Sequence, residues 1–412
     1  MASSASENLL PEVMPRNLEK TLSLESVKEV QTECDCNELH YGAWDAVFSA
    51  FVVAPLVVSV WRGTWGLMEL HASYFPYAQI YLLGIVIHIS FALVRSALLS
   101  RSVGAWREDH RAGRWLRERA LSRVYTYIFI LSNIMHWRGG WGLLDAAIAA
   151  ILPDDNDPHR PVLTAAFTIL FYLCAATLRS SRNLLASPYF LFTDGKEATY
   201  IFTTRFKNTS SRETALYVLD CVFSVAVVGS LVVFVWRGSW ALLDIFLFPE
   251  DPVKSCWTSL IVGYSVVIAT FSLQAPIRWV TARLHGAPRL LLADVYHLVS
   301  FIATVNVWRG FWGMLDIYFF PETPKLSNWC SHIASLVLLM LLNCSNSVLV
   351  RGVYIDAEEP AGECVVFPCH YLRLFFHKER TKKRHKRALA TAATRKPEID
   401  SSMPLQNPEE KV

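Results

Sequence analysis

The sequence predicts an all-α polytopic membrane protein whose eight transmembrane helices form four two-helix repeats in two duplicated halves. Three observations predict this class: the composition, eight separate apolar runs, and a nine-residue motif that occurs four times. Of 412 residues, 53% are hydrophobic and 18% are charged, and the mean hydropathy is +0.28. Such a composition is too apolar for an ordinary soluble chain.

The repeated motif organises the whole chain. It reads Trp-Arg-Gly-x-Trp, then three residues and an acid, and its copies begin at Trp61, Trp137, Trp236 and Trp308. On a helix, tryptophans at i and i+4 share one face, and the glycine lets another backbone approach closely. Trp beside Arg at the end of an apolar run is typical of a membrane–water interface. The motif therefore predicts eight interface anchors: Trp61, Trp65, Trp137, Trp141, Trp236, Trp240, Trp308 and Trp312.

Each copy also contains one arginine and one acid. The four sets are Arg62 with Glu69, Arg138 with Asp145, Arg237 with Asp244, and Arg309 with Asp316. Two arrangements are open. In the favoured one, each arginine pairs with the acid of its own copy and fixes the helix end. In the other, the four arginines surround the outer mouth of a pseudo-fourfold axis and attract anions.

Eight apolar runs predict the eight membrane-spanning helices. They lie near residues 44–60, 78–98, 123–136, 161–178, 215–235, 257–277, 290–307 and 329–350. Several are shorter than the roughly 20 residues that a span needs, but the motif lengthens each odd-numbered helix. A proline follows each motif, at Pro76, Pro153, Pro249 and Pro321, and we expect it to end the helix.

Basic residues in the loops predict the orientation. Eight Lys or Arg lie from Arg95 to Arg123, six in the loop after the fourth run and three in the loop after the sixth, whereas the loops after the odd-numbered runs hold seven altogether. By the positive-inside rule, both termini are cytoplasmic and every motif faces outward. The sequon at Asn208 then lies on the cytoplasmic side, and we expect it to stay unglycosylated.

The spacing of the motif divides the chain into two halves. The copies are 76, 99 and 72 residues apart, which gives a first half at 44–214 and a second at 215–376. The longest interval contains two aromatic, β-prone runs around Asp194-Gly195, a strong hairpin signal. We therefore predict short cytoplasmic β-hairpins at about 186–206, after the fourth helix, and at about 351–372, after the eighth.

The two ends of the chain differ in charge. Residues 1–43 hold eight Asp or Glu against three Lys or Arg, and we expect a disordered cytoplasmic tail without a cleavable signal peptide. Residues 377–412 form a basic cytoplasmic tail. Two interpretations of this tail are equally supported. It is either a solvated basic tail or a segment attracted to anionic inner-leaflet lipid, at about 1 kcal/mol per basic residue. The residues concerned are Lys378, Arg380, Lys382, Lys383, Arg384, Lys386 and Arg387.

Three acids lie near the cytoplasmic starts of helices one, five and seven: Asp45, Asp220 and Asp294. Acids within spans often mark ion or proton paths, but near a helix N-terminus they also suit the helix dipole, and we favour a structural role. Deeper polar residues such as His297 and Asn343 are expected to bond across helices. Cys256 and Cys330 lie near outer helix starts, where both a disulfide and free thiols are possible.

No catalytic constellation is recognisable in the sequence. It contains no phosphate-binding loop, no His-Glu-x-x-His and no Gly-x-Ser-x-Gly elbow, and its nine cysteines show no metal-ligand spacing. We therefore expect no enzyme activity, no cofactor, no metal site and no nucleic-acid partner. The partner that the sequence itself predicts is the lipid bilayer.

The four Trp-Arg-Gly-x-Trp copies, the eight spans and the inward termini resemble the Fuseless family, over residues 44 to about 372. The resemblance implies an eight-pass neuronal membrane protein of insects and other invertebrates, located in the plasma membrane at presynaptic active zones. It also implies a role in localising voltage-gated calcium channels and supporting neurotransmitter release, with scaffold proteins as partners. Fuseless proteins have also been likened to permeases.

Two hypotheses follow. The leading one is an organiser whose cytoplasmic segments dock channel or scaffold proteins. The alternative is a transporter, permease or channel for a small, possibly anionic, solute along the pseudo-symmetry axis. An open, polar-lined axis would favour transport, whereas a packed apolar seam would favour the organiser.

Overall fold

The computed structural model describes residues 42–104, 111–154, 156–194, 204–206, 214–349, 359–360 and 362–371. The chain divides into two compact units, Met1–Asp45 with His370–Val412, and Ala46–Cys369. Most of the acidic tail and all of the basic tail lie outside the described residues, so the predictions made for them stay predictions.

The described part of the chain is helical, and all eight predicted apolar runs fall on helices. These are α2 (Ala54–Leu70), α3 (Tyr77–Gly104), α4 (Arg111–Ile151), α5 (Arg160–Thr177), α6 (Thr214–Phe223), α7 (Ser230–Phe246), α8 (Pro252–Thr281), α9 (Gly286–Tyr318) and α10 (Pro324–Leu341). Five helical stretches are long and apolar enough to cross a membrane: Gly42–Leu70, Arg160–Thr177, Ala215–Phe246, Pro252–Thr281 and Gly286–Tyr318. The motif helices end before their prolines, as expected.

Two of the helices contain a π-helical turn at matching positions. One covers Ser49–Val53 before α2, and the other covers Ser224–Gly229 between α6 and α7. The serine that opens each turn bonds to a neighbouring segment: Ser49 Oγ donates to Pro188 O at 2.6 Å, and Arg205 N donates to Ser224 Oγ at 2.8 Å. π-Turns of this kind often mark functional places in helices. Here they fix the segments that follow α5 to the helices around them.

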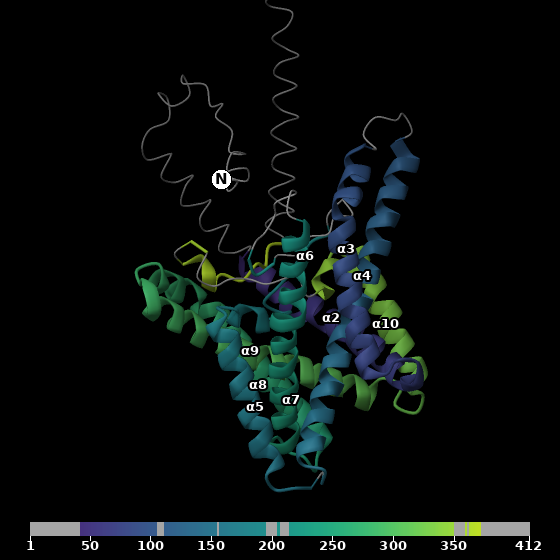
Figure 1. The fold of residues 1–412 in the computed structure, drawn as a ribbon. Helices are drawn as coiled ribbons and strands as arrows, with labels where there is room; N and C mark the ends of the chain where they lie inside the picture. The colour runs from purple at the N-terminus through teal and green to yellow at the C-terminus, as the bar shows by residue number, and fades with distance from the viewer. Residues whose placement is uncertain are drawn as a thin grey trace, which may run out of the picture. The chain divides into compact units, whose positions relative to one another are not determined.

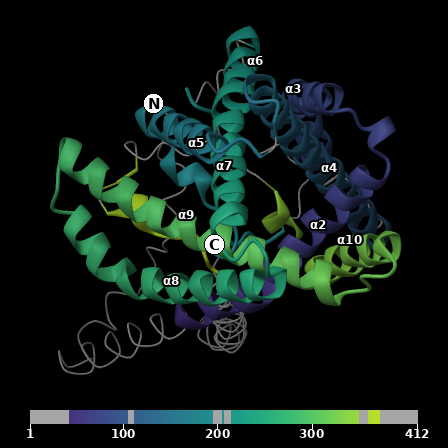
Figure 2. The ribbon, with the colours of Figure 1, turned by 90° about the horizontal axis from the view of Figure 1, so that it is seen from below.

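The helices surround a common centre in four tightly packed pairs (Figures 1 and 2). The pairs with the most extensive packing are α2 with α10, α3 with α4, α5 with α7, and α8 with α9. Each motif helix therefore packs most closely against the helix that precedes it, and the first motif helix packs against the last helix of the chain. The predicted two-helix units, in which each motif helix pairs with the following one, are not the most tightly packed units.

The motif glycine explains this choice of partner. A Cβ on Gly63 would lie 2.5 Å from Asn328 O and 2.6 Å from His332 N of α10, and a Cβ on Gly139 would lie 2.6 Å from Tyr77 O of α3. Such distances are too short for any side chain, so the backbones touch only because these residues are glycines. The motif glycine thus determines which helix packs against its own: α10 beside Gly63 and α3 beside Gly139. This agrees with the predicted close approach of two backbones.

The two predicted β-hairpins are wrong. The described residues contain no strand, and the nearest feature is an isolated parallel bridge between Leu191 and Cys369. The aromatic residues read as strand are buried among the helices instead: Tyr189 is 0% exposed, and its hydroxyl bonds to Thr270 Oγ1 of α8 at 2.6 Å. A single hairpin is marginally stable in water, whereas burial of these rings stabilises the inserted chain. The tip of the first hairpin, from Gly195, lies outside the described residues.

Two non-α segments follow α5 and α10, and we call them the central segments (residues 178–194 and 342–349). Both begin with a residue in the left-handed conformation, Arg179 (φ 55°) and Asn343 (φ 59°), followed by a short 3₁₀ turn, Ser181–Leu184 or Ser345–Val348. A residue with positive φ ends a helix. For this reason α10 ends at Leu341, and the eighth predicted run, which extends to 350, is too long.

Asp194 joins the two central segments. Its carboxylate accepts the backbone N–H groups of Ser345 (3.1 Å) and Asn346 (2.7 Å), and Arg123 of α4 pairs with it from the other side. Orphan N–H groups at the start of a short helical turn are often satisfied by an acid in this way. The acid that the sequence placed in a hairpin turn is therefore a cap that joins the end of the first half to the end of the second.

Candidate functional site

The eight motif tryptophans form two closed four-membered rings around the central axis. The first tryptophan ring contains Trp61, Trp137, Trp236 and Trp308, and the second contains Trp65, Trp141, Trp240 and Trp312. Neighbouring side chains in the first ring have centroids 5.2–5.6 Å apart and interplanar angles of 72–77°. In the second ring the values are 5.5–6.1 Å and 77–84°. Each edge-to-face contact adds about 0.5–1.5 kcal/mol beyond burial.

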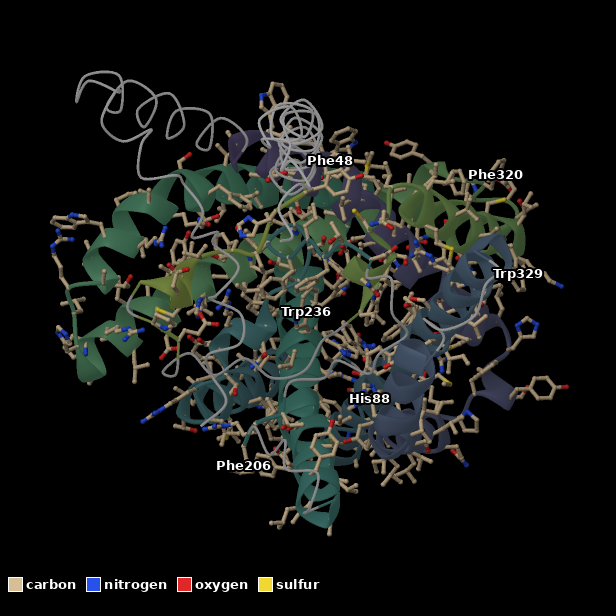
Figure 3. The ribbon with its side chains drawn as sticks, turned by 90° about the horizontal axis from the view of Figure 1, so that it is seen from above. Phe48, His88, Phe206, Trp236, Phe320 and Trp329 are labelled. Atoms are coloured by element: carbon tan, nitrogen blue, oxygen red, sulfur yellow. The ribbon has the colours of Figure 1, made fainter. Side chains whose placement is uncertain are left out.

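The order within each ring follows the order of the copies along the chain. Trp61 of the first copy contacts Trp137 of the second and Trp308 of the fourth, and Trp236 of the third contacts both of these. Trp236 accordingly lies at the centre of the surrounding helices, whereas Phe320 and Trp329 lie at the periphery (Figure 3). The tryptophans thus contact one another around the axis, and the prediction that they are interface anchors stays a prediction. The two tryptophans of each copy are spaced at i and i+4, so both lie on the face of their helix that is turned toward the axis.

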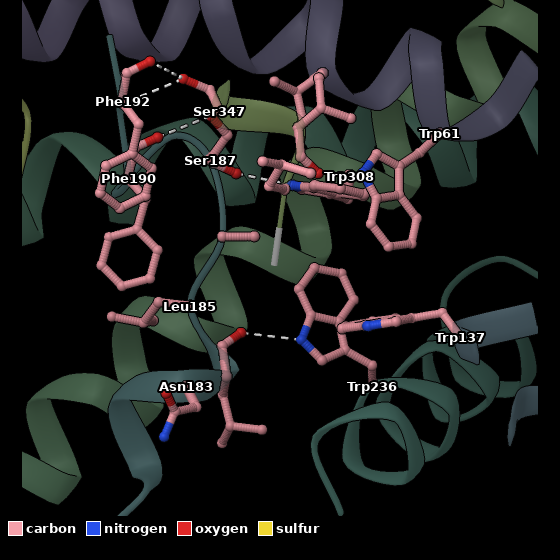
Figure 4. A pocket seen from close by; sticks show the side chains of 15 residues that line it. Trp61, Trp137, Asn183, Leu185, Ser187, Phe190, Phe192, Trp236, Trp308 and Ser347 are labelled. Atoms are coloured by element: carbon pink, nitrogen blue, oxygen red, sulfur yellow. Dashed lines mark hydrogen bonds between the residues drawn. The ribbon is translucent and has the colours of Figure 1, made fainter. Parts of the chain in front are cut away.

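The central segments cover the first tryptophan ring. Three indole N–H groups donate to their backbone carbonyls: Trp61 to Val348 O (3.1 Å), Trp236 to Leu184 O (2.9 Å) and Trp308 to Ser187 O (2.8 Å) (Figure 4). The space left between this ring and the central segments is only about 50 Å³. Buried indole N–H groups need acceptors, and the inserted backbone supplies them. The axis is closed at this level.

A larger cavity lies between the two tryptophan rings. Its volume is about 180 Å³, and it is lined by the eight motif tryptophans alone. The side chains of the second ring are half-buried, whereas Trp61, Trp236 and Trp308 of the first ring are buried. The cavity is therefore an aromatic chamber with a closed floor and a partly exposed rim.

A closed ring of ion pairs surrounds the tryptophans. Each motif arginine pairs with the acid of the preceding copy. The pairs are Arg62–Asp316 (2.7 Å), Arg138–Glu69 (3.2 Å), Arg237–Asp145 (2.6 Å) and Arg309–Asp244 (2.8 Å). The favoured expectation of pairing within one copy is therefore wrong. An arginine and an acid seven residues apart are separated by about 10 Å along a helix, whereas the neighbouring motif helix brings its acid alongside.

The arginines are buried and the acids are exposed. The arginine side chains are 1–22% exposed, and those of the acids are 39–59% exposed. Two guanidinium groups have further partners on the helix packed against their own: Arg62 donates to Ser327 and Ser331 of α10 at 3.0 Å, and Arg309 donates to Ser255 (2.8 Å) and Ser259 (2.9 Å) of α8. The rim consequently presents carboxylates, not guanidinium groups, to solvent.

The three acids at the helix starts bind chain segments. Asp220 accepts Phe206 N at 3.0 Å, and Asp294 accepts Ser181 Oγ at 2.6 Å. Within the first compact unit, Asp45 accepts Tyr371 N at 3.1 Å. These contacts fit the structural role favoured for them, because each acid anchors a non-helical segment to the start of a helix.

Other predicted polar residues also join elements. His297 of α9 contacts Ser181 Oγ and Cys364 O, each at 3.0 Å, and Asn343 Nδ2 donates to Asp194 O at 3.4 Å. Cys256 and Cys330 are free thiols. Within the described residues, no group of three His, Cys, Asp or Glu side chains is placed to hold a metal ion.

Sequence reasoning missed the carbonyls that receive the indole N–H groups. Ser187 lies in the first predicted hairpin, Val348 lies in the eighth predicted run, and Leu184 lies between the fourth run and the first hairpin. A signal was present, because Leu178-Arg179-Ser180-Ser181 has a counterpart 164 residues later in Leu342-Asn343-Cys344-Ser345. Both stretches follow an even-numbered predicted run at the same distance, so they occupy matching places in the two predicted halves.

The helices and their packing define a multi-pass membrane protein of the all-helical class, built around an aromatic axis. The chain belongs to the Fuseless family: the family model described as Fuseless matches residues 40–349, which include all four motif copies. No significant match to a curated protein or to a solved structure was found.

Proposed function

We propose that this protein is a non-enzymatic organiser in the presynaptic plasma membrane, where it supports neurotransmitter release by localising voltage-gated calcium channels. The presynaptic role is what the Fuseless resemblance implies for this chain. The single structural observation that supports an organiser is the closed central axis. Tryptophan side chains surround it at two levels, and the central segments close it at a third.

The closed axis favours the organiser over the permease. A path for a polar solute needs a continuous row of polar groups or water. Here the chamber is lined by indole rings alone, and the arginines that could attract an anion are buried in ion pairs. An anion entering this axis would lose its hydration without gaining a partner.

The organiser proposal includes an eight-span topology with both termini in the cytoplasm. The three other proposed spans are α3, α4 and α10. α3 and α4 pack against each other, and α10 packs against α2, which belongs to an apolar stretch. α10 has 18 residues, and the apolar part of α3 covers Tyr77–Phe91. Partners around them shield their polar positions from lipid, which lets less apolar helices cross. The loop charges support the inward termini.

The surface proposed for the partner is the arm formed by the end of α3 and the start of α4. α3 ends at Gly104 and α4 begins at Arg111, so both helices extend beyond the predicted apolar runs at 78–98 and 123–136, and they pack side by side (Figure 1). The sequence between α3 and α4 and at the start of α4 is rich in arginine, with Arg107, Arg111 and Arg114 within eight residues. Such an arm suits an acidic cytoplasmic surface of a channel or scaffold protein.

Affinity capture of the full-length protein from neuronal membranes tests this proposal. We expect calcium-channel subunits or active-zone scaffold proteins among the captured proteins. Replacing Arg107, Arg111 and Arg114 together by Gln should reduce their recovery, whereas the matched triple change of Lys382, Lys383 and Arg384 to Gln should not. Absence of any such partner from the unchanged protein contradicts the proposal. Solute flux by the purified protein in proteoliposomes would support the permease instead.

A further inference from the structure

We propose that the chamber between the two tryptophan rings binds a small quaternary ammonium cation, of the size of tetramethylammonium or the choline head group. This inference is independent of the organiser proposal, because it concerns a ligand on the axis and not a protein partner on the arm. Four observations support it: the size of the chamber, the arrangement of its walls, the charge at its rim and the absence of acidic or hydroxyl side chains from its lining.

The size fits one such cation. The chamber volume is about 180 Å³, and an apolar cavity of about 150 Å³ in another protein holds one benzene molecule. A four-membered ring with sides of 5.5–6.1 Å has its centre roughly 4 Å from each centroid, inside the limit of about 6 Å for a cation–π contact. A cation on the axis would thus contact four indole rings of one layer at once.

The walls have the electronic character that a cation needs. Neighbouring rings are nearly perpendicular, so they do not lie flat across the axis. Tryptophan provides the most favourable aromatic face for a cation. One ring of this layer already faces a cation from within the protein: the Arg237 guanidinium lies 5.5 Å from the ring centroid of Trp141.

The rim favours positive over negative ligands. The side chains of Glu69, Asp145, Asp244 and Asp316 are 39–59% exposed, whereas their arginine partners are 1–22% exposed. Every ion pair therefore points its negative end toward solvent. Four such carboxylates around one mouth raise the local concentration of cations.

The lining distinguishes a quaternary ammonium from other cations. The chamber wall consists of indole rings, and it contains no carboxylate, carbonyl or hydroxyl group. A metal ion or a primary ammonium would lose its water without gaining an acceptor. A quaternary ammonium has no N–H donors, and its methyl groups pack against aromatic faces, so it loses little on entry.

Binding to the full-length protein in nanodiscs tests the inference. Tetramethylammonium and choline are titrated, with 3,3-dimethyl-1-butanol as the neutral isostere of choline, and heat of binding and tryptophan fluorescence are recorded. We expect saturable binding of both cations, with the neutral isostere at least about tenfold weaker, as the loss of a desolvated cation–π contact implies. Equal affinity for choline and its isostere, or no saturable binding of either cation, overturns the proposal.

Variants locate the site and separate it from misfolding. Trp240→Leu and Trp312→Leu should each weaken choline binding about tenfold, whereas Trp279→Leu, at a tryptophan that is 59% exposed outside the rings, should leave it unchanged. If the ring variants fail to fold, uniform replacement of tryptophan by mono-, di- and trifluorotryptophan provides the second measurement. Affinity should fall stepwise with fluorination, because fluorine withdraws charge from the ring face. Unchanged affinity across that series overturns the proposal.

Discussion

Arg62 and Asp316 join the first motif copy to the last: Arg62 Nε lies 2.7 Å from Asp316 Oδ1, although 254 residues separate the two in sequence. The pair closes a ring in which every copy binds the copy before it. The closure also requires α10, since Arg62 donates to Ser327 and Ser331 of that helix. The fold around the axis is therefore complete only when the last helix has joined the first.

The first prediction concerns this closing pair. Arg62→Met should lower the free energy of unfolding by about 2–3 kcal/mol, because it removes one ion pair and two charge-assisted hydrogen bonds from a buried position. Asp316→Asn should cost less, because the carboxylate is 54% exposed and water replaces part of what it loses. Thermal unfolding of the purified variants in detergent measures both.

Arg237→Met provides a matched control in the same ring. Its side chain is 22% exposed, compared with 5% for Arg62. We expect a smaller loss of stability than for Arg62→Met. Equal losses at the two positions would show that closure through α10 adds nothing to the stability of the ring.

The second prediction tests the contact that selects the helix pairs. Gly63→Ala should destabilise the protein by about 3 kcal/mol or prevent its assembly, because the new methyl group would meet backbone atoms of α10, which cannot move aside. Gly140→Ala, one residue after a motif glycine, should be tolerated, since its nearest neighbour is the side-chain atom Val233 Cγ1 at 3.3 Å. Recovery of monodisperse protein and the thermal midpoint distinguish the two. Good folding of Gly63→Ala would contradict the close packing of α2 on α10.

The sequence predicted the helices well and their neighbours less well. Apolar runs and prolines located the helices because both act within a few residues along the chain. Arg62 pairs with Asp316 and not with Glu69. This choice depends on how the four motif helices are arranged in space, and no local sequence pattern encodes that arrangement. Tryptophan at the end of an apolar run is typical both of interfaces and of buried aromatic packing, and the two cannot be separated without the neighbouring helices.

The hairpins failed for a related reason. Asp194-Gly195 is a strong local turn signal, and it was read together with aromatic runs of β type. Burial of Tyr189 among helices and the N–H groups of Ser345 and Asn346 around the Asp194 carboxylate override that signal. Tertiary contacts of this kind are worth more than a propensity that spans about 1 kcal/mol.

The third prediction concerns the thiol of Cys344, which follows α10. Burial, and next the negative charge of Asp194, raise the pKa of this thiol from 9.0 to about 12. The thiol should therefore stay protonated and resist iodoacetamide at pH 8 in the folded protein, because the thiolate is the reactive form. The half-buried Cys330 should be alkylated before Cys344, and peptide mapping by mass spectrometry measures the order.

The same shift has a consequence for stability. Above about pH 9, an unfolded chain releases the Cys344 proton while the folded chain keeps it, so the free energy of unfolding falls as pH rises from about 9 toward 12. Below pH 9 both states hold the proton and this residue contributes no pH dependence. Cys344→Ala should reduce the alkaline slope, by at most about 1.4 kcal/mol per pH unit. An unchanged slope would show that the thiol ionises alike in both states.

The fourth prediction tests the proposed orientation. Glu250 and Glu322 are exposed and occupy equivalent Phe-Pro-Glu turns after α7 and α9, and His285 is exposed between α8 and α9. Cysteine at Glu250 or Glu322 should react with a membrane-impermeant maleimide on intact cells, because the positive-inside rule places those turns outside. Cysteine at His285 should react only after permeabilisation. Glu250→Cys and Glu322→Cys lie at equivalent turns and control for local accessibility. Both should be labelled alike if the motif copies share one orientation. Labelling of His285→Cys on intact cells would reverse the topology and remove the arm between α3 and α4 from the cytoplasmic side.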